Sequence, residues 1–170
     1  MKLIIQIPCL NEVDTLKSVI DSIPQKIKGI DVIETLVIDD GSTDGTSEYA
    51  KEIGVTHIIR NTQNKGLARS FSRGVEACLR LGADIIVNTD GDNQYPSHEI
   101  EKLVTPIING DADIVIGNRG GMDNPHFSIF KRRLQVFGSR VISAIIGVNV
   151  PDAVSGFRAI SRQAATEMNI

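Results

Sequence analysis

The hydrophobic residues of this chain fall into short β-branched runs separated by stretches with helical spacing. The runs predict five strands, at Leu3–Ile7, Ile33–Ile38, Thr56–Ile59, Ile85–Asn88 and Ile114–Ile116. Each run is almost continuously apolar, as is typical of strands covered on both faces of a parallel sheet. Apolar residues three and four positions apart predict helices over Leu16–Ile23, Leu67–Leu81 and Ile100–Ile107.

This alternation predicts the order βαβαβαβαβ and therefore an α/β fold. We expect an open, mostly parallel sheet flanked by helices in three layers, α/β/α. In such folds the ligand lies beyond the carboxyl ends of the strands, where loops and helix N-termini converge. The loops that follow the strands are therefore the place to look for function.

Length and composition narrow the class of protein. The 170 residues fit one core, so residues 1–170 are expected to form a single domain, truncated at the C-terminus because another helix begins near Asn169. A net charge of -3 with only 4% aromatic residues argues against a nucleic-acid partner. Cys9 and Cys78 lack CxxC spacing and follow no signal peptide, so free thiols in a cytoplasmic setting are expected. No apolar run approaches the ~20 residues of a membrane-spanning helix.

The most informative strand end is the fourth, which is followed by Asp90-Gly91-Asp92-Asn93-Gln94. Two carboxylates and a carboxamide are hard oxygen ligands that suit Mg²⁺ or Mn²⁺. Mg²⁺ is usually held by one or two carboxylates together with substrate phosphates, so Asp90 and Asp92 would fix a metal that bridges a diphosphate. The alternative is a solvated acidic turn, because short Asp-x-Asp patterns are common by chance.

Polar residues also follow the first two strands. Pro8–Glu12 comes after the first, and the loop Asp39–Thr46 after the second, with carboxylates, hydroxyls and two glycines that suit the base and ribose of a nucleotide. The loop also fits an ordinary turn with an Asx cap. An EF-hand frame starting at Asp90 fails because Tyr95 stands where glycine is required. The first strand end also lacks the GxGxxG of dinucleotide sites and the Asp-x-Asp of haloacid phosphatases.

Together, six segments resemble family 2 glycosyltransferases, and among them the dolichol- or polyprenyl-phosphate mannose synthase-like enzymes. The segments are Ile7–Glu12, Val37–Asp44, Asn64–Ala68, Asp90–Gln94, Ile116–Arg119 and Ser155–Arg158. The resemblance implies a GT-A fold, a Mg²⁺ or Mn²⁺ cofactor, and inverting transfer of a hexose from a GDP- or UDP-sugar.

The resemblance also implies roles for individual residues. The nucleotide-binding set is Pro8, Leu10, Asn11, Glu12, Asp39, Asp40, Ser42, Lys65, Gly66, Asp90 and Gly91, and the metal set is Asp90, Asp92 and Gln94. The expected catalytic set is Asp90 and Asp92 together with Arg119 and Asp152, the last two chosen for the chemistry that the acceptor requires. Two departures stand out: Val13 replaces a frequent second acid, and Gly91 replaces the commoner alanine, which is expected to loosen the turn.

The acceptor side leaves three alternatives. For a polyprenyl phosphate, whose oxygen is already anionic, the enzyme needs positioning cations, and Arg119, Arg133 and Arg158 are the candidates. For a glycan hydroxyl it needs a base, for which Asp152 is the candidate. A catalytically silent nucleotide-sugar-binding module is the third. A basic start at Lys131 followed by an apolar helix fits either a core helix or contact with a membrane surface. The resemblance favours the membrane, so we expect an enzyme at the cytoplasmic face of a membrane.

Overall fold

The computed structural model of the protein describes residues 1–117 and 155–168, which build a six-stranded sheet of order β3-β2-β1-β4-β6-β5. The strands are β1 (Lys2–Cys9), β2 (Val32–Asp39), β3 (His57–Arg60), β4 (Ile85–Asn88), β5 (Ile114–Ile116) and β6 (Arg158–Ser161). β1 is parallel to β2 and β4, and β2 is parallel to β3. β6 runs antiparallel to β4 and β5. The mostly parallel sheet is confirmed, and β6 is the strand that the five hydrophobic runs do not include.

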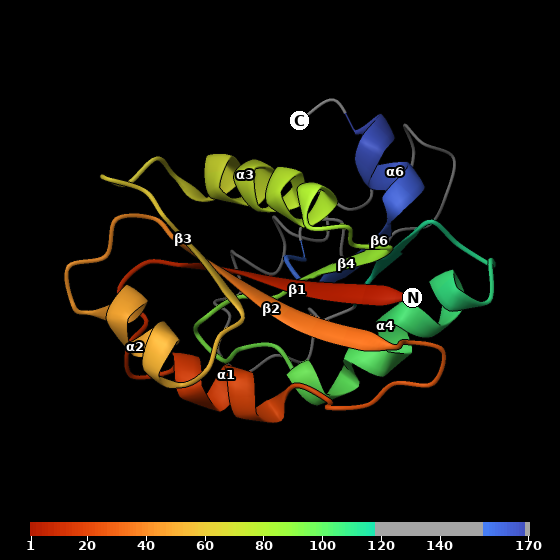
Figure 1. Ribbon diagram of the computed structural model, residues 1–170, viewed down its shortest axis with the longest axis horizontal. Coiled ribbons are helices and arrows are strands. Elements are labelled where there is room, and N and C mark those ends of the chain that lie inside the picture. The colour runs from red at the N-terminus through yellow and green to blue at the C-terminus, as the bar shows by residue number, and fades with distance from the viewer. Residues whose placement is uncertain (118–154, 169–170) are drawn as a thin grey trace, which may run out of the picture.

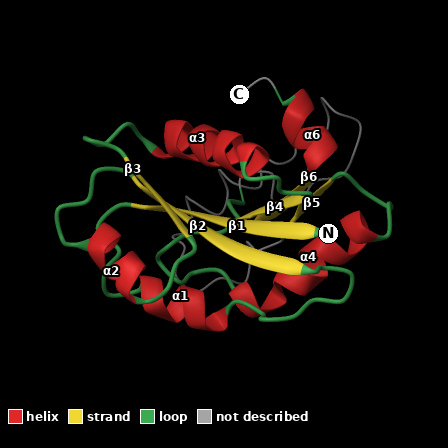
Figure 2. Cartoon of the chain, viewed as in Figure 1, coloured by secondary structure: helices red, strands yellow, loops and turns green. Residues whose placement is uncertain are grey.

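Helices cover both faces of the sheet (Figure 1). They are α1 (Leu16–Ser22), α2 (Thr46–Glu52), α3 (Leu67–Arg80), α4 (Ile100–Ile108) and α6 (Arg162–Glu167). α3 and α6 lie on one face, and α1, α2 and α4 lie on the other (Figure 2), which gives the expected three layers. The three helices predicted from spacing are confirmed, and α2 occupies the place that the βαβ order requires between β2 and β3.

The core explains why the strands read as continuous apolar runs. Along β1, Leu3, Ile5 and Ile7 face the core beneath α1, α2 and α4, whereas Ile4 faces the core beneath α3 and α6. All four are fully buried. Because alternate side chains of a strand point to opposite faces, a strand buried on both sides leaves no position for a polar surface residue. β1 therefore gives the loop that follows it a rigid base.

The strands around β1 differ in length, and this creates a gap at one edge of the sheet. β2 pairs with β1 as far as Cys9, whereas β4 pairs with it only as far as Gln6. Thr89 N donates to Gln6 O at 3.1 Å, so Pro8, two residues further on, also faces the β4 side. Within residues 1–117 and 155–168 no strand pairs with Pro8 on that side, so the N–H that proline lacks is not needed for a ladder there.

The carboxyl ends of β1, β2 and β4 therefore meet at one edge, on the side away from the N-terminus in Figure 1. Among the described residues, no helix has the length and apolar character needed to cross a membrane. The helix expected from about Lys131 lies outside the described residues.

Candidate functional site

A cleft of about 220 Å³ lies in the gap beside the end of β1. Four segments line it: the end of β1 with its loop, the residue after β2, the start of α3, and the turn after β4. The lining residues are Pro8, Cys9, Leu10, Glu12, Asp40, Asn64, Gly66, Leu67, Ser70, Asp90, Gly91 and Asp92. Strand ends that are far apart in the sequence thus bring four carboxylates to one cavity.

The structure brings most of the predicted nucleotide and metal residues to this cleft. Those that line it are Pro8, Leu10, Glu12, Asp40, Gly66, Asp90, Gly91 and Asp92. Those that stand behind the lining and hold it are Asn11, Asp39, Ser42 and Lys65. Gln94 is exposed and is not part of the lining, so its role as a ligand stays a prediction. Arg119, Arg133 and Asp152 lie outside the described residues.

Asp39 and Asp40 are adjacent in sequence but have different surroundings. Asp39 is fully buried, and its carboxylate accepts from Ser42 N at 2.7 Å and from the Ser47 hydroxyl. Arg60 Nε lies 3.5 Å from the same carboxylate. Asp39 therefore shapes the loop after β2 and takes no part in the lining of the cleft.

Asp40 lines the cleft and ties β2 to the start of α3. Its carboxylate accepts from Asn61 Nδ2 at 2.7 Å, Lys65 N at 2.9 Å and Gly66 N at 2.8 Å. Burial alone would raise the pKa of Asp40, but these hydrogen bonds outweigh burial and hold the pKa below its ordinary value of 3.8. The carboxylate stays ionised, and Lys65 and Gly66 contribute backbone amides to the site.

A second set of hydrogen bonds joins the loop after β1 to the loop after β2. Asn11 N donates to Ser42 Oγ at 2.9 Å, and Asn11 Oδ1 accepts from Thr43 N at 2.9 Å. Asn11 adopts a positive φ of 58°, a conformation that asparagine tolerates better than most residues. Glu12 N donates to Thr46 Oγ1 at 3.0 Å. These contacts fix the direction in which Glu12 enters the cleft.

Glu12 is the carboxylate whose pKa is raised. Burial is the main cause, and the nearby charges of Asp92 and Asp44 add to it, while a hydrogen bond from Thr15 Oγ1 at 2.9 Å opposes them. Like charges crowded into one cleft disfavour the ionised form. A bound cation would relieve this repulsion, so the electrostatics of the cleft favour a positively charged ligand.

The turn after β4 is held on its other side by the segment before β6. Tyr95 Oη accepts from Gly156 N at 2.9 Å, and the Tyr95 and Phe157 rings stack at 5.4 Å. The Gly156 backbone lies so close to Asp90 that a Cβ there would be 3.2 Å from both carboxylate oxygens. Within the turn, Gln94 N donates to Asp92 Oδ1 at 3.0 Å. The predicted Ser155–Arg158 segment therefore contributes backbone to this site.

The donor set fits a divalent metal that shares its coordination with a diphosphate. Asp90 and Asp92 supply hard oxygen atoms at the mouth of the cleft. Among residues 1–117 and 155–168, no group of three or more His, Cys, Asp or Glu side chains is arranged to hold a metal unaided. Such a pair of carboxylates matches the way Mg²⁺ is bound when substrate phosphates complete its coordination.

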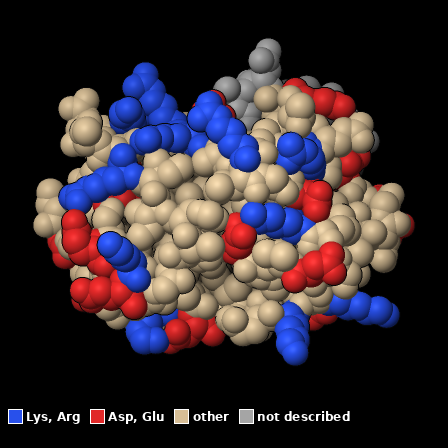
Figure 3. Space-filling view, in the orientation of Figure 1, with Lys and Arg blue, Asp and Glu red and all other residues tan. Residues whose placement is uncertain are grey.

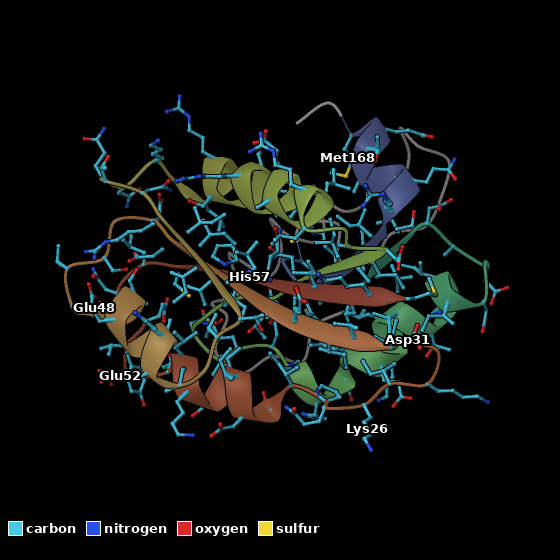
Figure 4. All side chains as sticks on the ribbon, viewed as in Figure 1. Lys26, Asp31, Glu48, Glu52, His57 and Met168 are labelled. Carbon is cyan, nitrogen blue, oxygen red and sulfur yellow. The ribbon has the colours of Figure 1, made fainter. Side chains whose placement is uncertain are left out.

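Arg158 and His57 do not line the cleft. Arg158, a candidate for the acceptor phosphate, donates from Nη2 to Ser155 O at 2.6 Å and stands over the Phe71 ring at 5.6 Å. It is not among the cleft-lining residues. His57 begins β3, at the opposite end from the strand's carboxyl edge, and bonds to Glu34 Oε2 at 2.8 Å (Figure 4). No metal or catalytic role is assigned to it.

Four lining residues are absent from the predicted site sets, namely Cys9, Asn64, Leu67 and Ser70, although the first three lie in segments that resemble the family. Cys9 is only 3% exposed and packs in the core, yet its position at the end of β1 also brings it to the cleft. Leu67 and Ser70 are three residues apart at the start of a helix and so share a face. That spacing, next to the recognised Asn64–Ala68 segment, is the signal that would have identified Ser70.

Comparison with known proteins agrees with this geometry. A sequence model described as "Glycosyl transferase family 2" matches residues 4–168. The chain belongs to this family. Dolichol-phosphate mannosyltransferase of Pyrococcus furiosus is 32% identical over 171 residues, which cover 96% of this chain and 47% of that protein.

Other similar proteins are named for different sugars. UDP-N-acetylglucosamine–dolichyl-phosphate N-acetylglucosaminyltransferase of Methanococcus voltae is 29% identical over 178 residues, covering 93% of this chain and 68% of that protein. A crystal structure of glucosyl-3-phosphoglycerate synthase from Mycobacterium tuberculosis with Mn²⁺, UDP and glucosyl-3-phosphoglycerate matches with a TM-score of 0.72 at 28% identity, covering 95% of this chain and 57% of that one. The predicted GT-A fold is confirmed, and this chain spans about half to two-thirds of the length of these proteins.

Proposed function

We propose that this chain is the nucleotide-sugar-binding part of an inverting, metal-dependent glycosyltransferase that moves a hexose from a GDP- or UDP-sugar to a polyprenyl phosphate. The observation that carries the proposal is the gathering of Asp40, Asp90, Asp92 and Glu12 in one cleft at the carboxyl edge of the sheet. Family membership supports the reaction class, and the relatives' names support a lipid-phosphate acceptor.

The cleft offers suitable contacts to each part of a nucleotide sugar. Leu10 and Leu67 line it although they are 40% and 66% exposed, which gives the flat face of a base two apolar surfaces at the mouth. Asp40 offers a carboxylate to a ribose hydroxyl or a base imino group, because an ionised carboxyl only accepts hydrogen bonds.

Asp90 and Asp92 then face the diphosphate. Mg²⁺ or Mn²⁺ bound by these carboxylates would neutralise the charge that develops on the leaving diphosphate. Glu12 adds negative charge beside Asp92, which strengthens the attraction for a cation. The chain itself contributes orientation: the loops after β1, β2 and β4 hold the carboxylates in fixed directions through backbone hydrogen bonds.

The surface next to the cleft supports an anionic acceptor at a membrane. Lys65, Arg69, Arg73 and Arg80 are exposed along α3 and the loop before it. Figure 3 shows lysine and arginine side chains gathered along the upper edge of the molecule, over α3. A basic edge of this kind attracts lipid phosphates and anionic headgroups. With an acceptor whose oxygen is already anionic, the reaction needs no general base.

Calorimetry with UDP and GDP, each with and without Mn²⁺, tests the donor side. We expect one nucleotide to bind, to bind more tightly with Mn²⁺, and to lose the Mn²⁺ dependence in Asp92→Ala. Glu52→Ala is the matched control, because Glu52 lies on α2 and points away from the sheet (Figure 4). Nucleotide binding that ignores Mn²⁺ and survives Asp92→Ala would overturn the metal role.

Transfer of radiolabelled sugar into a solvent-extractable lipid tests the acceptor. The protein is mixed with polyprenyl phosphate and labelled GDP-mannose or UDP-N-acetylglucosamine. We expect label in the lipid phase only with Mn²⁺ or Mg²⁺ present. Label that instead reaches a water-soluble glycan would favour a hydroxyl acceptor, and nucleotide binding without any transfer would favour a silent binding module.

A further inference from the structure

We propose that Cys9 and Thr15 are positioning residues that hold the Asp90-Gly91-Asp92 turn from two sides, and that glycine is required at position 91 because the Cys9 sulfur fills the space of a side chain there. The proposal rests on the proposed role of this turn in binding a metal and a diphosphate. It names the residues that place the two carboxylates.

The first contact is steric. A Cβ on Gly91 would lie 2.8 Å from Cys9 Sγ and 3.2 Å from Glu12 Cγ. Gly91 is not among the residues with positive φ, so its backbone conformation alone would accept alanine. The expectation that Gly91 loosens the turn stays a prediction. Gly91 allows the turn to lie directly on the sulfur.

The sulfur cannot easily give way. Cys9 is the last residue of β1, is 3% exposed, and its thiol lies 3.5 Å from Ile7 O. Its side chain has one torsion, whereas Glu12 is long and can bend aside. β1 lies between β2 and β4, so the sheet holds Cys9 in place. The turn that packs against the Cys9 sulfur is therefore positioned by the central strands.

The second contact is a hydrogen bond. Thr15 Oγ1 lies 2.7 Å from Gly91 O and 2.9 Å from Glu12 Oε2, and its single proton is shared between these two acceptors, with Gly91 O the nearer. Thr15 stands immediately before α1, and its backbone N donates to Glu12 O at 3.2 Å, so the hydroxyl is itself anchored. The sulfur blocks movement of the turn towards the sheet, and the hydroxyl holds its carbonyl. Gly91 is thus fixed between the two carboxylates that flank it.

A shift of the turn would matter because metal sites tolerate little displacement. Restoring an ordinary contact of 3.4 Å between a Cβ at position 91 and the sulfur requires a movement of about 0.6 Å. Metal–ligand distances are held to within about 0.2 Å. Cys9 is not a reactive thiol in this setting, because burial and the carboxylates of Glu12, Asp39 and Asp90 raise its pKa.

The experiment is a double-mutant cycle with two readouts. Gly91→Ala, Cys9→Ala and Cys9→Ala/Gly91→Ala are compared for Mn²⁺ affinity in the presence of UDP or GDP, by calorimetry, and for Tm without metal. We expect Gly91→Ala to weaken Mn²⁺ binding at least tenfold and to lower Tm by about 3–6 °C. Removing the sulfur makes room for the new methyl group, so the double variant should recover to within about threefold of Cys9→Ala.

Cys78→Ala/Gly91→Ala is the matched control, since Cys78 is an equally buried thiol in the core beneath α3 and away from the cleft. It should bind Mn²⁺ as weakly as Gly91→Ala. Thr15→Val should weaken Mn²⁺ binding, and Thr15→Ser, which keeps the hydroxyl, should restore it. The proposal is overturned if Gly91→Ala behaves as the unmodified protein, or if removing the Cys9 sulfur fails to recover both readouts.

The two readouts separate this proposal from the function it builds on. If the unmodified protein binds no Mn²⁺ with either nucleotide, the proposed function fails. The Tm cycle on the metal-free protein then still decides whether Cys9 is the reason for glycine at position 91.

Discussion

Replacing Asp40 by asparagine tests how the cleft is held to α3. The substitution keeps the shape of the side chain and removes its charge. The remaining side-chain oxygen can still accept from Asn61 Nδ2 and Lys65 N. The new NH₂ group, however, faces Gly66 N, so two donors meet where Gly66 N now donates to the carboxylate at 2.8 Å. Gly66 N retains Asn64 Oδ1 at 2.9 Å as a second acceptor, which limits the loss.

Hydrogen bonds to a charged acceptor contribute about 1.5–3 kcal/mol each, so we expect Asp40→Asn to cost about 2 kcal/mol. For a chain of this size that corresponds to a fall in Tm of about 4–8 °C. The measurement is thermal and urea unfolding at pH 7, 5 and 3.5, with the exposed Asp111→Asn as control.

The pH dependence has a definite sign. Because folding lowers the pKa of Asp40, its contribution is fully present above the unfolded-state value of about 3.8 and is lost as pH falls through the lower folded-state value. The difference between the two proteins should stay constant from pH 7 to 5 and shrink at pH 3.5. A Tm within 1 °C of the unmodified protein at pH 7, or a difference that grows on acidification, would refute the reasoning.

Three further outcomes are expected. Gly74→Ala should lower Tm by about 4–8 °C, because its Cβ would overlap Gln6 Oε1 and lie 2.8 Å from Ile38 Cδ1, whereas Gly74→Ser should be no better. Cys9 and Cys78 are free and buried, so a thiol reagent at pH 8 should label neither in the folded protein and both in urea; rapid labelling of the folded form would contradict the burial. Lys65→Glu/Arg69→Glu should reduce sedimentation with anionic vesicles at low salt, while Lys26→Glu, on the side away from α3 (Figure 4), should not, and equal losses would refute a role of the basic edge.

The fold was largely predictable from the sequence because burial on both faces leaves a simple pattern. The runs Ile85–Asn88 and Ile114–Ile116 coincide with β4 and β5. β1 extends beyond its predicted end, Ile7, to Cys9. The prediction stopped before Pro8 because proline usually ends a strand, but β4 pairs with β1 only as far as Gln6, so Pro8 needs no N–H on that side. β6 escaped the pattern because its four residues, Arg158–Ser161, include only two apolar side chains with a polar residue on each side, which is too short a run to stand out.

The site was predictable to the level of segments, and less so to the level of side chains. The sequence placed Asp39 and Asp40 together, but neighbouring residues of a strand point to opposite faces, and only the packing shows which one reaches the cleft. Lys65 and Gly66 were expected as binding residues, and their backbone amides are what the fold uses. A contact made by a backbone N–H does not depend on the type of side chain. The sequence could therefore locate these two residues, but could not show that their backbone amides make the contacts.

The unequal lengths of β1 and β4 have a consequence for how such proteins diversify. The cavity exists because one strand stops three residues before its neighbour, and strand length is not altered by exchanging side chains. If the cleft binds a nucleotide sugar as proposed, substitutions at its rim can change which sugar fits while the gap between the strands persists. Relatives that are named for mannose and for N-acetylglucosamine share this chain's fold family. A cleft whose space is set by the ends of the strands can change its lining side chains while the sheet stays the same.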